Sequence, residues 1–123
     1  IDLPADQYVD NGFAEGVCSD PVVMNNYIHD ELCDKKISVG LLNCCWDGVC
    51  FLKEHAADFT DPVLVLHGAD DGIVSEKDSR EFFGDISSKD KSLRIYAFLY
   101  HELLNEPCKD QIIKEIIEWI DSH

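Results

Sequence analysis

The chain has 123 residues, 46% of them hydrophobic, which is enough for one domain with an apolar core. Its net charge of -15 comes from 10 basic and 25 acidic residues, so it lacks the cations that neutralise nucleic-acid phosphates or bind an anionic membrane surface. No apolar run is long enough to span a bilayer. We therefore expect no nucleic-acid partner and no transmembrane segment.

The first half of the chain predicts helices after an irregular start. Residues 1–16 are polar and carry one proline and two glycines, which predicts irregular structure. Asp20 and Pro21 then form a helix start signal, with Asp20 as N-cap and Pro21 at the first helical position. Apolar residues recur near helical spacing from Lys36 to Ala57, and this composition predicts a long helix buried on more than one face. We expect Trp46, within it, to belong to the core.

The stretch from Pro62 to Val74, PVLVLHGADDGIV, predicts a short buried strand followed by a sharp loop. The apolar run ends before Gly68, and two acids follow at Asp70 and Asp71. In an open α/β sheet, ligands and chemistry lie at the carboxyl ends of the strands. The acids are therefore placed where a functional site is expected, whereas His67 is expected to be a strand-end residue.

A second strand and loop follow after one helix-length segment. Residues 75–88 predict a helix, and residues 92–98, SLRIYAF, predict a strand that leads to His101. A strand, a helix and a parallel strand form a right-handed crossover unit. The repeated apolar positions of residues 107–121 predict a final amphipathic helix, with Asn105 as its N-cap.

An acid and a histidine that each follow a parallel strand are the orienting half of a nucleophile–histidine–acid triad. His101 would be the general base, because the unperturbed pKa of histidine lies near neutral pH. On the residues alone, a loop histidine that caps the last helix is an equal alternative. Asp70 competes with Asp71 for the role of the acid.

Two loops carry a resemblance to a known family. Gly68, Asp71 and Val74 match the G-x-x-D-x-x-V loop that holds the triad acid in α/β-hydrolases. Residues 100–107, YHELLNEP, are similar to the histidine loop of the monoacylglycerol lipase and lysophospholipase branch, which is serine aminopeptidase S33-like. The similarity runs from about Asp20 to the C-terminus, and the spacing from Gly68 selects Asp71 over Asp70.

The resemblance implies an α/β fold, specifically the C-terminal portion of an α/β-hydrolase. This portion would hold a βαβ unit with parallel strands, together with cap-derived and terminal helices. Residues 1–35 would be the remainder of the cap or lid, and residues 36–123 would be the C-terminal part of the core.

The chain departs from the family in one respect, because it has no G-x-S-x-G nucleophile elbow. The nearest string is residues 36–40, KISVG, where lysine replaces the first glycine. Cys18 is a candidate cysteine nucleophile, but residues 16–20, GVCSD, lack the second glycine of an elbow and no buried strand precedes them. We therefore expect the serine and the oxyanion hole to lie upstream, outside this chain.

The function implied by the resemblance is hydrolysis of carboxylic esters with an acyl chain, of the monoacylglycerol or lysophospholipid type. Asp71 and His101 would complete a Ser-Asp-His triad, and Ile73 and Val74 would line the substrate pocket. No metal or organic cofactor is expected, and the ligand would be a small ester or a lipid. The missing strands would come from the upstream half of the same hydrolase or from self-association.

Two alternatives stay open at this point. The chain could be a catalytically inert fragment or a binding half that needs a partner chain. The same acid and histidine could also serve another α/β-hydrolase chemistry, such as epoxide opening or peptide hydrolysis.

The six cysteines include no C-x-x-C pair, which favours reduced thiols and a cytoplasmic protein. A zinc site formed by Cys44, Cys45, Cys50 and His55 fits no standard ligand spacing.

Overall fold

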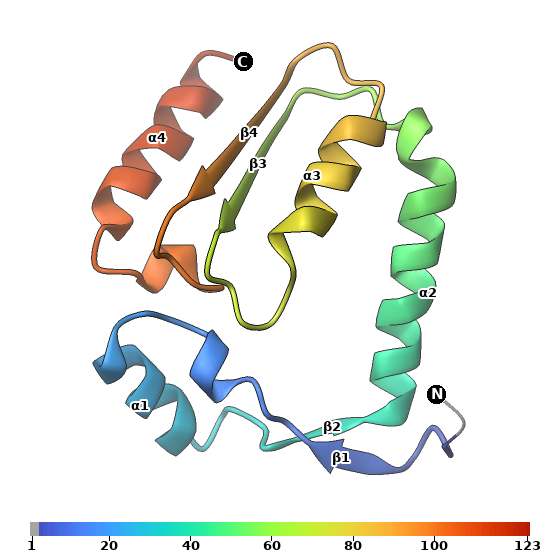
Figure 1. Cartoon of the computed structure of the whole chain (residues 1–123), viewed down its shortest axis with the longest axis vertical. Coiled ribbons are helices and arrows are strands. Elements are labelled where there is room, and N and C mark those ends of the chain that lie inside the picture. The colour runs from blue at the N-terminus through green and yellow to red at the C-terminus, as the bar shows by residue number, and fades with distance from the viewer. Residues whose placement is uncertain (1–2) are drawn as a thin grey trace.

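The computed structural model describes residues 3–123, and Ile1 and Asp2 lie outside the described residues. The described chain forms two small sheets, which lie at different ends of the molecule (Figure 1). One is the antiparallel pair β1 (Tyr8–Asp10) and β2 (Lys36–Ser38), and the other is the parallel pair β3 (Val63–Gly68) and β4 (Lys91–Tyr96).

The parallel pair and its connecting helix confirm the predicted βαβ unit. β3 and β4 pair in register from Val63 opposite Lys91 to Gly68 opposite Tyr96, and α3 (Glu76–Asp85) connects them. α3 begins because the Ser75 hydroxyl accepts a hydrogen bond from the Lys77 amide at 3.3 Å. Both strands therefore end at the same edge of the sheet, where the two predicted loops emerge.

The last helix, α4 (Lys109–Asp121), forms as the apolar repeat predicts, but its predicted cap is wrong. Asn105 ends the short 3-10 helix η3 (Leu103–Asn105), and its side-chain amide donates to Glu102 instead of capping α4. Cys108 occupies the N-cap position, and no side chain caps this helix end.

The side chain of Glu115 on α4 ties this helix to the sheet. This group accepts hydrogen bonds from Arg94 at 2.6 Å and from the Tyr96 hydroxyl at 2.7 Å, both on β4. Ile112 on the same helix is 1% exposed. In the view of Figure 1, α4 lies to the left of the β3–β4 pair and α3 to its right.

The N-terminal half differs from its prediction at two short strands. α1 (Pro21–His29) begins as expected, because the Asp20 carboxylate accepts a hydrogen bond from the Val22 amide at 2.8 Å. The predicted irregular start contains β1, however, and the predicted long helix begins only at α2 (Val39–His55). Residues 36–38 are drawn into strand β2 by pairing with β1. The β1–β2 ladder joins residues on both sides of the predicted division between cap residues 1–35 and core residues 36–123. That division stays a prediction.

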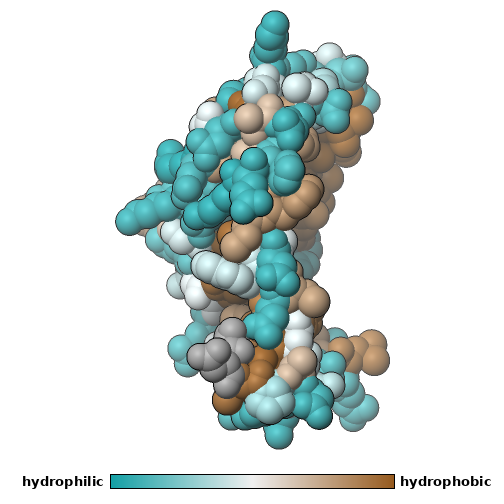
Figure 2. Space-filling model, turned by 90° about the vertical axis from the view of Figure 1, so that its right-hand side faces the viewer, coloured by the Kyte–Doolittle hydropathy of each residue, from teal (hydrophilic) through white to brown (hydrophobic). Residues whose placement is uncertain are grey.

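The expected burial of α2 on more than one face is wrong. Val39 is its one buried residue, and Trp46, expected in the core, is 67% exposed. Figure 2 views the molecule from the side of α2 and shows apolar surface beside polar side chains. The large apolar residues of α2 that are exposed are Leu41, Trp46, Val49, Phe51 and Leu52. Within residues 3–123, nothing covers this side of the helix.

No helix in the part of the chain that the structure describes is long and apolar enough to cross a membrane. All six cysteines lie within this part and are free thiols.

Candidate active site

The loop after β3 folds around the side chain of Asp71. Its Oδ1 atom accepts hydrogen bonds from the backbone amides of Ile73 at 2.8 Å and Val74 at 3.0 Å. An aspartate that binds amides two and three residues ahead stabilises a tight turn by itself. Only 3% of the side chain is exposed, so the carboxylate is held in one orientation with Oδ2 left for other partners.

His101 supplies one of those partners from the loop after β4. Its Nδ1 atom lies 2.9 Å from Asp71 Oδ2, and 42% of its side chain is exposed. A carboxylate oxygen can only accept, so Nδ1 carries the proton and Nε2 is the basic nitrogen of the neutral ring. Among the described residues, Nε2 has no hydrogen-bond partner. The imidazole is therefore oriented by an acid and open to a further group.

The acid loop and the histidine loop lie together because Gly68 has no side chain. A Cβ atom at this position would come within 2.2 Å of the Tyr100 carbonyl oxygen and within 2.3 Å of the Leu99 carbonyl oxygen. The Asp70 amide donates to the Leu99 carbonyl at 3.0 Å, which joins the two loops. The glycine of the predicted motif thus allows the backbones of the two loops to approach each other closely.

A third segment, residues 16–19, braces both loops, and no local pattern in the sequence predicts this. The Gly16 carbonyl accepts from the His101 amide at 3.4 Å, and the Val17 carbonyl accepts from the Glu102 amide at 2.7 Å. A Cβ atom on Gly16 would lie 2.9 Å from the backbone of Gly72 in the acid loop. Gly16 and Gly72 therefore permit a close crossing of these segments.

Glu106 fastens this third segment to the histidine loop. Its side chain is completely buried, and Oε1 accepts from the Ser19 amide at 3.0 Å and from the Tyr100 amide at 2.8 Å. Oε2 accepts from the Ser19 hydroxyl. The carboxylate is satisfied by three donors, as a buried polar group must be.

The environment of Asp71 favours its charged form. Burial by itself would raise the pKa of this carboxyl, but hydrogen bonds from the Val74 amide, from His101 and from the Ile73 amide act in the opposite direction. The net result is a pKa below the ordinary value of 3.8. Asp71 is therefore a carboxylate at neutral pH and can stabilise a protonated His101.

The two residues expected to line a substrate pocket lie on the same loop. Ile73 is half-buried, and its side chain approaches Gly16. Val74 is 41% exposed and lines a groove of about 340 Å³ between α2 and α3. Asp70, the rival acid, is exposed, and it joins the site through its backbone amide.

The candidate nucleophiles within the described chain form no hydrogen bond with His101. Cys18 is 2% exposed, its thiol donates to the Asn105 carbonyl, and burial raises the pKa of this thiol. Ser38 is the N-cap of α2, and its hydroxyl accepts from the Leu41 amide at 3.1 Å. No serine, threonine or cysteine among residues 3–123 forms a hydrogen bond with His101. Among these residues, no cluster of three or more His, Cys, Asp or Glu side chains is arranged to hold a metal ion.

Comparison with known families and curated proteins gives a consistent result. Residues 5–108 match the family described as serine aminopeptidase, S33. A monoacylglycerol lipase of Mycolicibacterium smegmatis is 32% identical over 116 residues, which are 94% of this chain and 41% of the lipase. An uncharacterized abhydrolase domain-containing protein of Dictyostelium discoideum is 34% identical over 85% of this chain and 11% of its own length.

Solved structures show the same relationship. The crystal structure of the monoacylglycerol lipase of Paleococcus ferrophilus superposes with a TM-score of 0.83 and 25% identity, over 99% of this chain and 48% of that chain. A soluble variant of the Saccharomyces cerevisiae monoglyceride lipase, solved with a substrate analog, also has a TM-score of 0.83, over 95% of this chain and 44% of its own. The chain therefore spans less than half the length of these relatives.

Proposed function

Because the chain belongs to the serine aminopeptidase S33 family and has part of the α/β-hydrolase fold, we propose that Asp71 and His101 are the acid and the base of a Ser-His-Asp triad. The observation that carries this proposal is the 2.9 Å contact between His101 Nδ1 and Asp71 Oδ2, with Nε2 open. The reaction would be hydrolysis of a carboxylic ester.

Each residue then has a defined step. His101 Nε2 takes the proton from the serine hydroxyl as that oxygen attacks the ester carbonyl, and returns it to the leaving alcohol. Asp71 holds Nδ1–H and stabilises the imidazolium that forms. Water attacks the acyl-enzyme in the second half, and His101 again accepts and returns a proton.

The serine and the oxyanion donors would come from residues upstream of this chain in the same protein. Two observations support this: the similar lipases are more than twice as long, and no described hydroxyl or thiol forms a hydrogen bond with His101. The free edge of β3 and the exposed apolar residues of α2 support a fold completed by that upstream half. Self-association of this chain is the alternative way to cover them.

The proposed substrates are monoacylglycerols, in keeping with the names of the similar lipases, and lysophospholipids, which the resemblance of the histidine loop suggests. Ile73 and Val74 would contact the substrate from the acid loop, and residues 1–35 would belong to the cap over it. The proposed chemistry is carried by side chains and needs no metal or organic cofactor. The cytoplasmic location stays a prediction.

The test is hydrolysis of three substrates by the full-length protein: a long-chain monoacylglycerol, a lysophospholipid and an aminoacyl anilide. We expect the esters to be hydrolysed, and Asp71→Asn to lower kcat by about 10³ to 10⁴-fold. Asp70→Asn is the matched control, because it changes the exposed neighbouring acid. Ester hydrolysis that survives Asp71→Asn would contradict the proposal, and hydrolysis of the anilide alone would identify a peptidase instead.

A further inference from the structure

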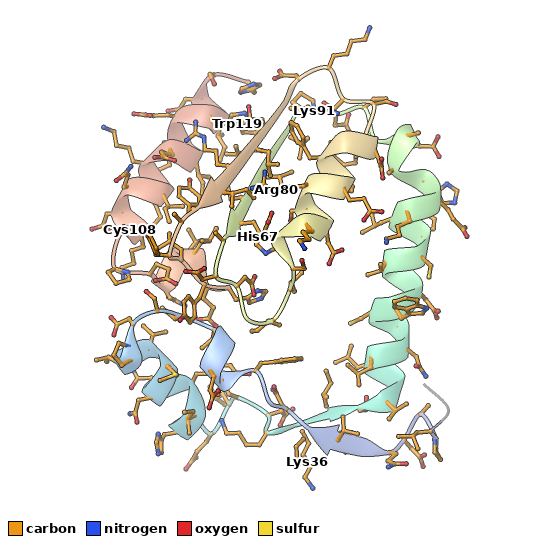
Figure 3. The ribbon with its side chains drawn as sticks, viewed as in Figure 1. Lys36, His67, Arg80, Lys91, Cys108 and Trp119 are labelled. Atoms are coloured by element: carbon orange, nitrogen blue, oxygen red, sulfur yellow. The ribbon has the colours of Figure 1, made fainter. Side chains whose placement is uncertain are left out.

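A second histidine contacts the acid loop from within the protein. His67 lies at the end of β3, is 8% exposed, and sits between β3 and α3 (Figure 3). Its Nδ1 atom lies 2.7 Å from the Ser79 hydroxyl on α3. Its Nε2 atom lies 3.2 Å from the Val74 carbonyl oxygen and 3.1 Å from Asp71 Oδ2.

These partners determine where the proton of His67 lies. A backbone carbonyl can only accept, so Nε2 carries a hydrogen that it donates to Val74, with Asp71 Oδ2 close beside it. The Ser79 hydroxyl can donate to Nδ1, which satisfies the neutral ring completely. His67 therefore presents an N–H group to the acid loop without needing a positive charge.

The contact with Val74 closes the acid loop. Val74 donates its amide to Asp71 Oδ1, and its carbonyl receives the His67 Nε2–H group. His67 is itself fastened to α3 by Ser79. The turn that fixes Oδ1 is thereby tied to both β3 and α3.

The contact with Asp71 places an N–H group beside the oxygen that faces His101. Oδ2 lies 3.1 Å from His67 Nε2 and 2.9 Å from His101 Nδ1. Two backbone amides donate to Oδ1, while Oδ2 lies between the nitrogens of the two histidines. A carboxylate held in this way rarely adopts an orientation that breaks its contact with His101.

We propose that His67 is a positioning residue, which holds Asp71 in the orientation that His101 needs. The catalytic consequence rests on the proposed function of the Asp71–His101 pair, whereas the structural consequence does not. His67 touches neither the substrate nor the reacting atoms, so its effect must pass through Asp71.

Two amide substitutions separate positioning from simple packing. In His67→Gln, the terminal amide falls near the place of Nε2, where it can still donate to the Val74 carbonyl and lie beside Asp71 Oδ2. In His67→Asn, the shorter side chain places its amide near Nδ1, where it reaches Ser79 but not the acid loop. Ser88→Ala is the control for lost stability, because Ser88 is 5% exposed, is hydrogen-bonded to Asp90, and lies at the opposite end of the strands.

The first measurement is the pH dependence of kcat/KM for a monoacylglycerol in the full-length protein. We expect His67→Asn to lower kcat by about 10-fold or more with KM nearly unchanged, because a small misplacement of a catalytic group has effects of this size. The apparent pKa of the acidic limb, which reports His101, should fall, since a loosened Asp71 stabilises the imidazolium less. His67→Gln should restore most of both values, and Ser88→Ala should change neither.

The second measurement needs no substrate and therefore stands apart from the proposed function. The pKa of His101 is followed by NMR titration in the wild-type protein and in both His67 variants. A lower His101 pKa in His67→Asn than in His67→Gln supports the inference even if no ester is hydrolysed. Equal His101 pKa values in both variants and the wild type would overturn it, as would equal loss of kcat in Gln and Asn.

Discussion

The Glu106 carboxylate binds the backbone amide of Tyr100, the residue directly before His101, at 2.8 Å. A completely buried acid thus sets the position of the candidate base through the backbone. The same carboxylate holds the amide and the hydroxyl of Ser19, so it also joins the histidine loop to the segment that braces it.

Glu106→Ala should destabilise the protein by about 2–4 kcal/mol, because it removes the three hydrogen bonds that a completely buried carboxylate accepts. Glu106→Gln should cost far less, since its oxygen can accept from both amides and its NH₂ group can donate to the Ser19 hydroxyl. Urea unfolding measures both, with Glu118→Ala, an exposed acid on α4, as control. Equal losses for Ala and Gln would mean that the charge of Glu106, and not its geometry, is what matters.

Gly68→Ala should also be strongly destabilising. The added Cβ atom would meet two backbone carbonyl oxygens, which cannot swing aside as a flexible side chain can. We expect a loss of about 2–3 kcal/mol in thermal or urea unfolding. Gly48→Ala is the control, because nothing lies within 4 Å of a Cβ atom there and alanine favours the middle of α2. A Gly68→Ala variant as stable as wild type would contradict the close contact of the two loops.

The lowered pKa of Asp71 predicts a specific pH dependence of stability. The folded state favours the ionised form of Asp71 more than the unfolded chain does. The resulting contribution to the free energy of unfolding is therefore present above the ordinary pKa of 3.8 and is lost as the pH falls through the pKa of the folded state. The difference in unfolding free energy between wild type and Asp71→Asn should therefore shrink as the pH is lowered from about 6 to about 3. A difference that stays constant over this range would contradict the assignment.

Tyr96 predicts the opposite behaviour at alkaline pH. Burial, together with the hydrogen bond and the charge of Glu115, raises the pKa of Tyr96 to about 12. The folded state keeps its proton while the unfolded state loses it near the ordinary value of 10.0, so stability should fall as the pH rises between these values. Tyr96→Phe should flatten this dependence, and Tyr8→Phe, at a 62% exposed position, should not. Identical alkaline unfolding curves for Tyr96→Phe and wild type would count against the Tyr96–Glu115 contact.

The parts of the fold that were predicted correctly have strong local signals. The apolar run before Gly68 predicts a strand, and the isoleucines that repeat at helical spacing in α4 predict an amphipathic helix. The pairing of β1 with β2 could not be predicted, because two three-residue strands carry no period and exist only by their mutual hydrogen bonds. Asn105 failed as a cap because η3 and its bond to Glu102 take up that residue.

The site shows the same division. The family spacing from Gly68 selects Asp71 as the acid that contacts His101. The turn that follows places the carboxylate of Asp71 on the amides of Ile73 and Val74. The contacts of His67, and the bracing of both loops by residues 16–19, join positions far apart in the sequence. Trp46 was expected in a core because it is apolar, but burial depends on what covers α2.

The most direct test of the Asp71–His101 pair is the rate at which a serine-reactive fluorophosphonate labels the full-length protein. We predict that one serine is labelled in the wild type and in His29→Gln, an exposed control on α1, and that His101→Gln slows labelling by about 10³-fold or more. Labelling of that serine at an unchanged rate in His101→Gln, or no labelled serine in the wild-type protein, would contradict the assignment of His101 as the base of a serine hydrolase.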